Sequence, residues 1–245
     1  MRHRSASTMI SAMVLAGALA AAGAAAAPAE SAPVFVNMTW SLGVDAGGRI
    51  TRLSTDDKQL PTLHEKLEKD IRSWKISPGK VDGVPAATES KLQLLLRLDA
   101  QADGNYRVNL AGASTGGGYG RQTAPKYPEN AAAGRRQGLV VLKVDYDEAG
   151  RVKDVEPYAG APQADTAFVR SATNAVKQWT FEPEVVGGHP RSSAALVPVC
   201  FRMDAPGVPH IDCHWTPPGA SGTSERMVAL DPAAKLESDV IGRAL

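Results

Sequence analysis

Apolar residues recur at every second position in two well-separated stretches of the chain. The first stretch runs through Val34, Val36, Met38, Trp40, Leu42 and Val44, and the second through Val140, Leu142, Val144 and Tyr146. A period of two turns alternate side chains to one face, so both stretches predict half-buried β-strands. An Asp-containing loop follows each strand, and its glycine, Gly48 or Gly150, stands where a hairpin requires positive φ. The pattern therefore predicts that each stretch opens with a β-hairpin.

Between each hairpin and a following tryptophan, the apolar spacing changes to three and four residues. The positions are Leu60, Leu63, Leu67, Ile71 and Trp74 in the first stretch and Phe168, Ala172, Val176 and Trp179 in the second. Such spacing is typical of an amphipathic helix with one face on a core. Thr62 and Glu65 are expected to form a capping box in the first helix, and Asp165 is the expected N-cap of the second. Trp74 and Trp179 are interpreted as core anchors that close each helix onto the sheet.

The two stretches also match each other downstream of the helices, which indicates one structural unit used twice. The matched positions, at identical spacing, are Trp74, Pro78, Gly83 and Pro85 in the first copy and Trp179, Pro183, Gly188 and Pro190 in the second. The Gly and Pro residues after each tryptophan are expected in turns between strands. Residues 94–100 match residues 199–205 as a closing strand, and residues 106–110 match residues 211–215 as a returning strand. The predicted fold class is therefore α+β, with two tandem β-β-α-β-β modules, each a helix packed on a small antiparallel sheet.

The N-terminal residues have the pattern of an export signal. Arg2 and Arg4 precede an uncharged, Ala-rich run at residues 9–29, and A-x-A sequences near its end suit cleavage around residues 27–30. Residues 1–29 are therefore expected to be a signal peptide, and the mature protein to be periplasmic. A retained inner-membrane anchor is the alternative, because the run approaches the roughly 20 residues that a spanning helix needs.

The modules are expected to be separated by a linker and followed by a tail. Residues 112–121 are rich in Gly, Ser and Thr, which predicts a flexible linker between a first module at residues 30–111 and a second at residues 122–218. Residues 219–245 are polar and predict a tail with a short helix at residues 231–244. No functional role follows from the composition of the tail.

The chain has two cysteines, Cys200 and Cys213. Exported proteins fold in an oxidising compartment, where such a pair is more naturally a disulfide than a catalytic or metal-binding pair. If residues 211–215 return as a strand beside residues 199–205, the two cysteines face each other across a hairpin.

Charge and motif content argue against several classes of function. The formal net charge is +1, without the excess of Lys and Arg that a nucleic-acid binder needs to neutralise phosphates. No nucleophile with a base, pair of acids or phosphate-binding glycine loop occurs in its required context, so neither an enzyme nor a cofactor is expected.

His210, Asp212 and His214 share one face of the expected returning strand. A metal site there requires a fourth ligand brought by the fold, and no metal is expected.

The second module resembles the TonB C-terminal domain family over roughly eighty residues. The residues that carry the resemblance are Pro125-Lys126-Tyr127-Pro128, Gly138, Gly150-Arg151-Val152, Trp179-x-Phe181-x-Pro183, Gly188-x-Pro190 and Val197-Pro198-Val199-x-Phe201. The first module is similar, although it lacks the Pro-x-Tyr-Pro opening and the Pro before its closing strand. The resemblance implies a helix packed on an antiparallel sheet, and a partner-binding role for an exposed edge strand that accepts an extended peptide.

The edge strand implied by the resemblance contains Val197, Pro198, Val199 and Phe201. An edge strand offers unpaired N–H and C=O groups, and Pro198 suits such a position because proline donates no ladder hydrogen bond. We therefore expect a periplasmic, non-enzymatic protein that recognises partners in the cell envelope, outer-membrane transporters among them, through this strand.

A membrane-anchored energy transducer that drives uptake through outer-membrane transporters is the alternative function. It needs a retained N-terminal anchor and a long spacer, whereas few residues separate the apolar run from Val34. Association with the membrane is expected only if the N-terminal segment is retained. A homodimer formed by strand exchange stays open.

Overall fold

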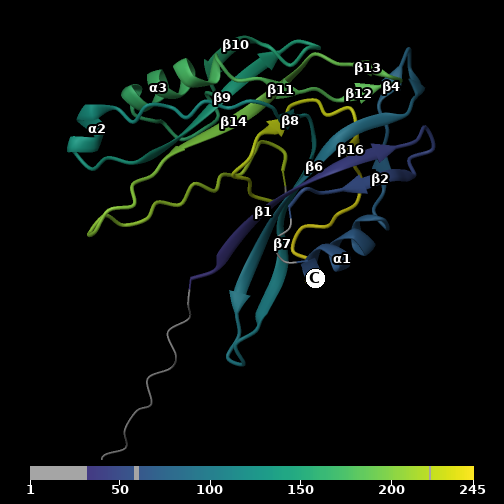
Figure 1. The fold of residues 1–245 in the computed structure, drawn as a ribbon, viewed down its shortest axis with the longest axis horizontal. Coiled ribbons are helices and arrows are strands. Elements are labelled where there is room, and N and C mark those ends of the chain that lie inside the picture. The colour runs from purple at the N-terminus through teal and green to yellow at the C-terminus, as the bar shows by residue number, and fades with distance from the viewer. Residues whose placement is uncertain (1–31, 58–60, 221) are drawn as a thin grey trace, which may run out of the picture. The chain divides into compact units, whose positions relative to one another are not determined.

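Two antiparallel β-sheets, each with a helix against one face, carry the fold of the computed structural model (Figure 1). The structure describes residues 32–57, 61–220 and 222–245, and the expected signal peptide at residues 1–29 lies outside the described residues. The mixed α+β class is confirmed, with many strands and few, short helices. In the described part of the chain, no helix has the length and apolar character that crossing a membrane requires.

The first sheet has the order β2-β1-β6-β7. Its strands are β1 (Val34–Val44), β2 (Ile50–Ser54), β6 (Thr88–Ala100) and β7 (Tyr106–Gly116). Alternate residues of β1, such as Trp40, point to the face where Leu67 and Ile71 of helix α1 (Pro61–Ile71) complete a buried cluster. The strand period and, from Leu63 onward, the helix period read from the sequence are confirmed here, whereas Leu60 lies outside the described residues. Because α1 begins at Pro61, Thr62 lies in its first turn and not at the N-cap.

The second sheet has the order β10-β9-β14-β15. Its strands are β9 (Gly138–Tyr146), β10 (Val152–Pro157), β14 (Ser193–Phe201) and the short β15 (Val228–Ala229). Helix α3 (Thr166–Val176) packs on this sheet through Phe168 and Val176, and helix α2 (Glu129–Ala133) precedes β9. The expected N-cap is confirmed, because the Asp165 carboxylate accepts a hydrogen bond from the Ala167 N–H at 2.8 Å.

The first hairpin turns of the two sheets have the same geometry. In each turn an aspartate Oδ1 accepts hydrogen bonds from the N–H groups two and four residues later, both at 2.9 Å for Asp45 and at 3.0 and 2.8 Å for Asp147. Gly48 and Gly150 have φ values of 84° and 73°, so both expected left-handed glycines are confirmed.

Several short strands pair in addition to those that form the body of the two main sheets. The small pairs are β3 (Ile76–Ser77) with β16 (Lys235–Leu236), β4 (Lys80–Val81) with β5 (Val84–Pro85), and β8 (Gly118–Tyr119) with β11 (Phe181–Glu182). The hairpin of β12 (Val185–Val186) and β13 (His189–Pro190) pairs with Thr88 and Glu89 of β6. A hairpin expected to belong to the second module therefore extends the first sheet, and two self-contained tandem modules are not shown.

The segment expected to be a flexible linker, residues 112–121, is structured instead. Gly112 pairs with Leu95 inside β7, and β8 follows directly. The glycine is required by lack of space, because a Cβ at Gly112 would lie 2.0 Å from the carbonyl oxygen of Thr223. The Gly-rich composition therefore reflects close packing of the main chain and not flexibility.

The expected polar tail with a helix at residues 231–244 is also corrected by the structure. This part of the chain forms β15 and β16 and then runs along β7, where the Leu110 N–H donates to the Arg243 carbonyl at 3.0 Å and the Gly242 N–H donates to the Leu110 carbonyl at 2.8 Å. Val240 is buried in the core of the first sheet. The apolar residues of the tail, Val240 among them, pack against the first sheet and make it part of the fold.

A buried carboxylate joins the first sheet to the C-terminal segment. Glu184, which is 4% exposed, accepts hydrogen bonds from the Ser90 hydroxyl at 2.7 Å and from the N–H groups of Ala233 and Ala234 at 2.6 and 3.1 Å. These donors compensate the loss of water around a buried acid. Ala32–Leu245 accordingly form one compact unit.

Candidate partner-binding site

The residues expected to bind partners, Val197, Pro198, Val199 and Phe201, lie together in the second half of β14. On one side this length of β14 pairs continuously with β9. What these residues can offer to a partner therefore depends on two things. One is how exposed their side chains are, and the other is whether the side of β14 away from β9 is already paired.

The side chains of Val197, Val199 and Phe201 point into the core of the second sheet, and none is more than 5% exposed. Phe201 stacks on Phe168 of α3 with 4.5 Å between ring centroids, and Tyr127 meets it edge-on at 5.6 Å. Burial raises the pKa of the Tyr127 phenol above its ordinary value. These side chains hold the strand in place, so at Val197, Val199 and Phe201 a partner can reach only the main chain, whereas the Pro198 side chain is half-buried.

On the side away from β9, β14 is paired only near its start. β15 lies opposite Ala195 and Leu196, and the Leu230 N–H donates to the Ala194 carbonyl at 2.9 Å. Among the residues that the structure describes, no strand pairs with residues 197–201 on this side. We call this length the β14 outer edge.

The direction in which main-chain groups point alternates along a strand, and this shows which groups face the open side of the β14 outer edge. The Ala194 carbonyl faces β15, so the main-chain groups of Leu196, Pro198 and Cys200 face the same side. Pro198 has no N–H. A partner strand would therefore meet the carbonyls of Pro198 and Cys200 and the N–H of Cys200. Pro198 stands where a proline removes no hydrogen bond from the ladder with β9.

A disulfide joins Cys200 to Cys213, as predicted, with the two Cα atoms 6.0 Å apart. The expected returning strand at residues 211–215 is wrong, since within it only Trp215 forms a β-bridge. Trp215 packs instead on Leu196, on the sheet face opposite α3. The disulfide-linked segment therefore covers a face of β14 and leaves its outer edge without a paired strand.

The residues expected to have structural roles lie around both helices and the β12–β13 hairpin. Trp74 and Trp179 follow α1 and α3 and are each 7% exposed. The Trp179 indole N–H donates to a main-chain carbonyl at 2.7 Å. Pro183 stands between β11 and β12, Gly188 has a φ of 83° in the β12–β13 turn, and Pro190 lies in β13.

His210, Asp212 and His214 do not converge on one point. Asp212 accepts a hydrogen bond from the His214 main-chain N–H at 2.9 Å and contacts its Nδ1, and the main-chain bond is the main cause that lowers the pKa of Asp212. The His214 Nε2 lies 3.3 Å from Glu225, whereas the His210 Nδ1 lies 3.9 Å from Asp204. Within the described ranges, no group of three or more His, Cys, Asp or Glu side chains is placed to hold a metal ion.

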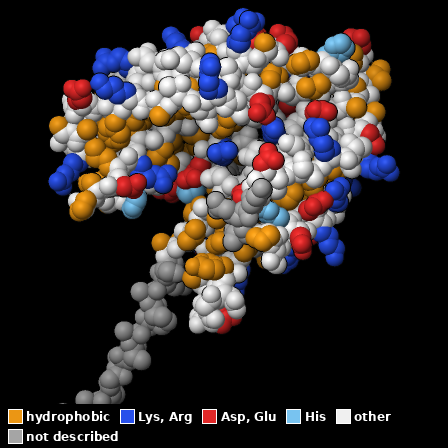
Figure 2. Space-filling model, in the orientation of Figure 1, with side chains coloured by type: hydrophobic (Ala, Val, Ile, Leu, Met, Phe, Trp, Pro, Cys, Tyr) orange, Lys and Arg blue, Asp and Glu red, His pale blue; other side chains and the backbone are white. Residues whose placement is uncertain are grey.

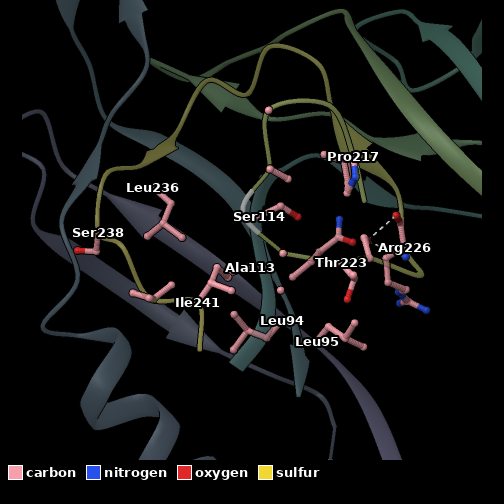
Figure 3. A pocket seen from close by; sticks show the side chains of 18 of the residues that line it. Leu94, Leu95, Ala113, Ser114, Pro217, Thr223, Arg226, Leu236, Ser238 and Ile241 are labelled. Carbon is pink, nitrogen blue, oxygen red and sulfur yellow. Dashed lines mark hydrogen bonds between the residues drawn. The ribbon is translucent and has the colours of Figure 1, made fainter. Parts of the chain in front are cut away.

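A cavity of about 310 Å³ that the sequence did not indicate lies between the first sheet and the C-terminal segment (Figure 3). Leu95 and Ser114 come from the sheet, and Arg226 and Leu236 from the C-terminal segment. Its walls mix apolar and polar groups from elements far apart in the sequence. Such a cavity has no local sequence signal.

Comparison with known proteins identifies the part of the chain that contains β14. Residues 123–203 match the family model of the Gram-negative bacterial TonB protein C-terminal. Protein TonB of Salmonella typhimurium is 35% identical over 80 residues, which cover 33% of this chain and 30% of that protein. Protein TonB of Xanthomonas campestris pv. campestris is 34% identical over 80 residues, which cover 33% of this chain and 35% of that protein. Protein TonB of Vibrio cholerae is 26% identical over 83 residues, which cover 34% of this chain and 33% of that protein.

Residues 123–203 therefore form a TonB C-terminal domain, as the resemblance implied, and the TonB proteins that they resemble are distant relatives. The chain spans about a third of the length of the curated relatives it matches. A second, degenerate copy of the domain is not shown, because the match does not include residues 30–111. The TonB family takes part in energy transduction to outer-membrane receptors, and its proteins are not enzymes.

Proposed function

We propose that this protein binds other proteins of the cell envelope by accepting an extended segment as an added strand at the β14 outer edge. The observation that carries the proposal is that, among the described residues, no strand pairs with residues 197–201 on the side of β14 away from β9, while the β9–β14 ladder on the other side is continuous. An added strand satisfies edge groups with its own main chain and needs no particular side chains. This suits β14, because its core-facing side chains are already buried.

The partners that we propose are envelope proteins, outer-membrane transporters among them. The TonB C-terminal domain at residues 123–203 supports this class of partner, since the family acts on outer-membrane receptors. The enzymatic alternative has no support in the family. Binding without catalysis is the function that fits a strand with an open main chain and a packed core.

We place the protein in the periplasm, as an adaptor released from the membrane by cleavage near residues 27–30. The apolar run at residues 9–29 ends just before β1, so a chain that kept it as an anchor would hold the first sheet close to the membrane. An anchored energy transducer is the second candidate, favoured by the family's role. The intact mass of the native protein separates the two, because only the adaptor lacks these residues.

We also propose that the two sheets derive from one repeated unit. Their first three strands have the same order, β2-β1-β6 and β10-β9-β14, with a helix at the same place in the chain. The Asp45 and Asp147 carboxylates accept hydrogen bonds from the same relative positions in their hairpin turns, which supports the same interpretation.

Binding of a model peptide to full-length, processed protein tests the proposed site. The probe is an acetylated and amidated seven-residue peptide of alternating Thr and Val, because main-chain recognition tolerates many side chains. Cys200→Pro removes the one N–H that the β14 outer edge offers, whereas Cys200→Ala keeps it. Both variants lose the disulfide, so they form a matched pair. We expect calorimetry to show weaker binding by Cys200→Pro than by Cys200→Ala, and equal binding by the two would contradict the site.

A further inference from the structure

The outer side of β1 is open over the first half of the strand. β6 pairs with β1 along its whole length, whereas β2 pairs with it only from Ser41 to Val44. In the described ranges, no strand pairs with residues 34–38 on the side away from β6. We call this length the β1 outer edge. In Figure 1 it is the part of β1 that extends past the end of β2.

The direction of the main-chain groups at the β1 outer edge follows from a single hydrogen bond. Thr55, just after β2, donates from its hydroxyl to the Thr39 carbonyl at 2.8 Å, so this carbonyl faces away from β6. Directions alternate along a strand, and the main-chain groups of Phe35 and Asn37 therefore face the same side. Each residue presents one N–H and one C=O. The β1 outer edge thus offers two donors, whereas the β14 outer edge offers one.

The side chains of these two residues are engaged on a face of the sheet and do not fill the edge. The Asn37 amide donates to Glu225 at 2.8 Å, and the Phe35 ring lies 4.0 Å from the His214 ring. These contacts fix β1 from one face. The strand is therefore held in an extended shape, while no strand among the described residues pairs with its outward main-chain groups.

Apart from the β14 outer edge, several sheet edges in the described part of the chain are covered or charged. The C-terminal residues run along β7, where the Leu245 N–H donates to the Val108 carbonyl at 2.9 Å, and β12 pairs with the start of β6. The edge strand β10 carries Lys153, Asp154 and Glu156. Charged side chains discourage the addition of a further strand. The β1 outer edge has neither form of protection.

Apolar residues flank the start of the β1 outer edge, whereas Glu225 and His214 lie against Asn37 and Phe35 on one face of the strand. β1 contains no charged residue, and its first residue, Val34, is 49% exposed. Val34 stands beside Leu98 of β6, which in turn stands beside Val108 of β7, and Tyr106 is 55% exposed. Figure 2 shows hydrophobic side chains gathered over this end of β1, β6 and β7. A segment docked here would place its side chains next to these residues, where a buried charge is unfavourable.

We propose that the β1 outer edge is a second docking site, which accepts an extended, uncharged segment of a partner protein as an antiparallel strand in line with β2. The partner supplies acceptors to the N–H groups of Phe35 and Asn37 and donors to their carbonyls. The site is independent of the β14 outer edge. A partner with two such segments would occupy both sheets and gain avidity from the second contact.

A linear segment suits this edge better than a second copy of the chain. The open length is short, and pairing it with the same edge of another copy covers far less than the roughly 1,200–2,000 Å² that stable interfaces bury. A flexible segment that becomes ordered on the edge can bind through its main-chain hydrogen bonds, without the large contact area that two folded copies need. The edge therefore favours a flexible, extended ligand.

Hydrogen exchange and a matched pair of variants test the second site on the full-length, processed protein, with the Thr-Val peptide as the probe. We expect saturating peptide to slow exchange at the Phe35 and Asn37 amides as well as at Cys200. Asn37→Pro removes an outward N–H without removing a bond to β6, and Asn37→Ala loses the same Glu225 contact but keeps the N–H. Asn37→Pro is expected to weaken binding at this edge about fivefold relative to Asn37→Ala.

The outcomes separate this proposal from the function proposed for β14. Protection of Cys200 without protection of Phe35 and Asn37 overturns the second site and leaves the first intact. Protection of Phe35 and Asn37 alone supports the second site and contradicts the first. Exchange at Phe35 and Asn37 that is already slow without peptide means that the chain itself or a second copy covers the edge, and this also overturns the proposal.

Discussion

The two sheets have the same order through their first three strands and differ after the third strand. Beyond β6 the chain turns back as β7 and pairs with it from Ala100 to Lys91. Beyond β14 the chain leaves the sheet, and β15 returns later to cover only Ala195 and Leu196. Whether the third strand of each sheet keeps an open side is therefore decided by the segment that follows that strand.

The sequences of these two segments explain the difference. Residues 106–116 contain no proline, so every residue can donate to a ladder, and they form the long strand β7. Residues 202–218 contain Pro206, Pro209, Pro217 and Pro218, which cannot donate to a ladder, and Cys213 is tied to the face of β14 by its disulfide. The second segment is thus unsuited to pairing with residues 197–201. The open edge follows from these constraints.

The largest expected effect comes from the side chains that hold β14 in place. Phe201→Ala removes a buried ring that contacts Phe168 and Tyr127, and we expect it to lower the free energy of unfolding by about 3–5 kcal/mol. Leu96→Ala is the matched change at the equivalent position of the first sheet, where the side chain is also fully buried. Urea unfolding measures both. A loss below about 1 kcal/mol for Phe201→Ala would mean that the ring is not part of the core.

The next effect concerns the buried acid, Glu184, that joins the first sheet to the C-terminal segment. Glu184→Ala leaves the buried N–H groups of Ala233 and Ala234 without their acceptor, and we expect a loss of about 3 kcal/mol in the free energy of unfolding. The Ser90 hydroxyl keeps the Gly116 carbonyl as an acceptor at 3.0 Å. Glu184→Gln keeps one acceptor oxygen and should lose less. Equal losses for the two variants, measured by urea unfolding, would show that packing and not hydrogen bonding dominates at this position.

A smaller effect tests whether β15 limits the β14 outer edge. Val228 lies opposite Leu196, so Val228→Pro removes an N–H that faces β14 and should free Leu196 for a partner. We expect the Thr-Val peptide to bind about fivefold more tightly to this variant, since one more hydrogen bond becomes available. Val228→Ala keeps the N–H and serves as the control. Unchanged affinity in calorimetry would mean that β15 does not compete with the peptide.

The smallest effect distinguishes the two hairpin turns by pH. The Arg151 N–H, together with the Lys153 and Arg151 side chains, lowers the pKa of Asp147 to about 2. Because this folded-state pKa lies below the ordinary value of about 3.9, the ionised carboxylate stabilises the fold above that pH and loses its effect as the pH falls through about 2. Asp147→Asn should therefore flatten acid unfolding followed by circular dichroism between about pH 4 and 2. Asp45→Asn controls for the loss of a turn aspartate, and an unaltered acid profile for Asp147→Asn would count against the assignment.

Local patterns predicted the elements of the fold better than their connections. The period-two run ending at Val44, the helix capped by Asp165 and the left-handed Gly48 and Gly150 all have local causes, and the structure confirms them. The strands that join distant parts of the chain have no such signal. Composition suggested a linker at Gly112, where close contact with Thr223 requires glycine.

The candidate site was predicted in part for the same reason. The family resemblance located β14, and the position of Pro198 on its outward side agrees with an edge. Sequence did not reveal that β15 covers the start of that edge, because the pairing joins residues more than thirty positions apart. The β1 outer edge was also missed, since its openness depends on where β2 ends.

Hydrogen exchange at the Cys200 amide tests most directly whether the second sheet accepts a partner strand. This N–H faces the open side of β14, so it should exchange rapidly in the free protein and about tenfold or more slowly with saturating Thr-Val peptide. Slower exchange at Cys200, with the neighbouring amides bonded to β9 unchanged, is the result that the account predicts. Peptide binding that leaves exchange at Cys200 unaltered would contradict it.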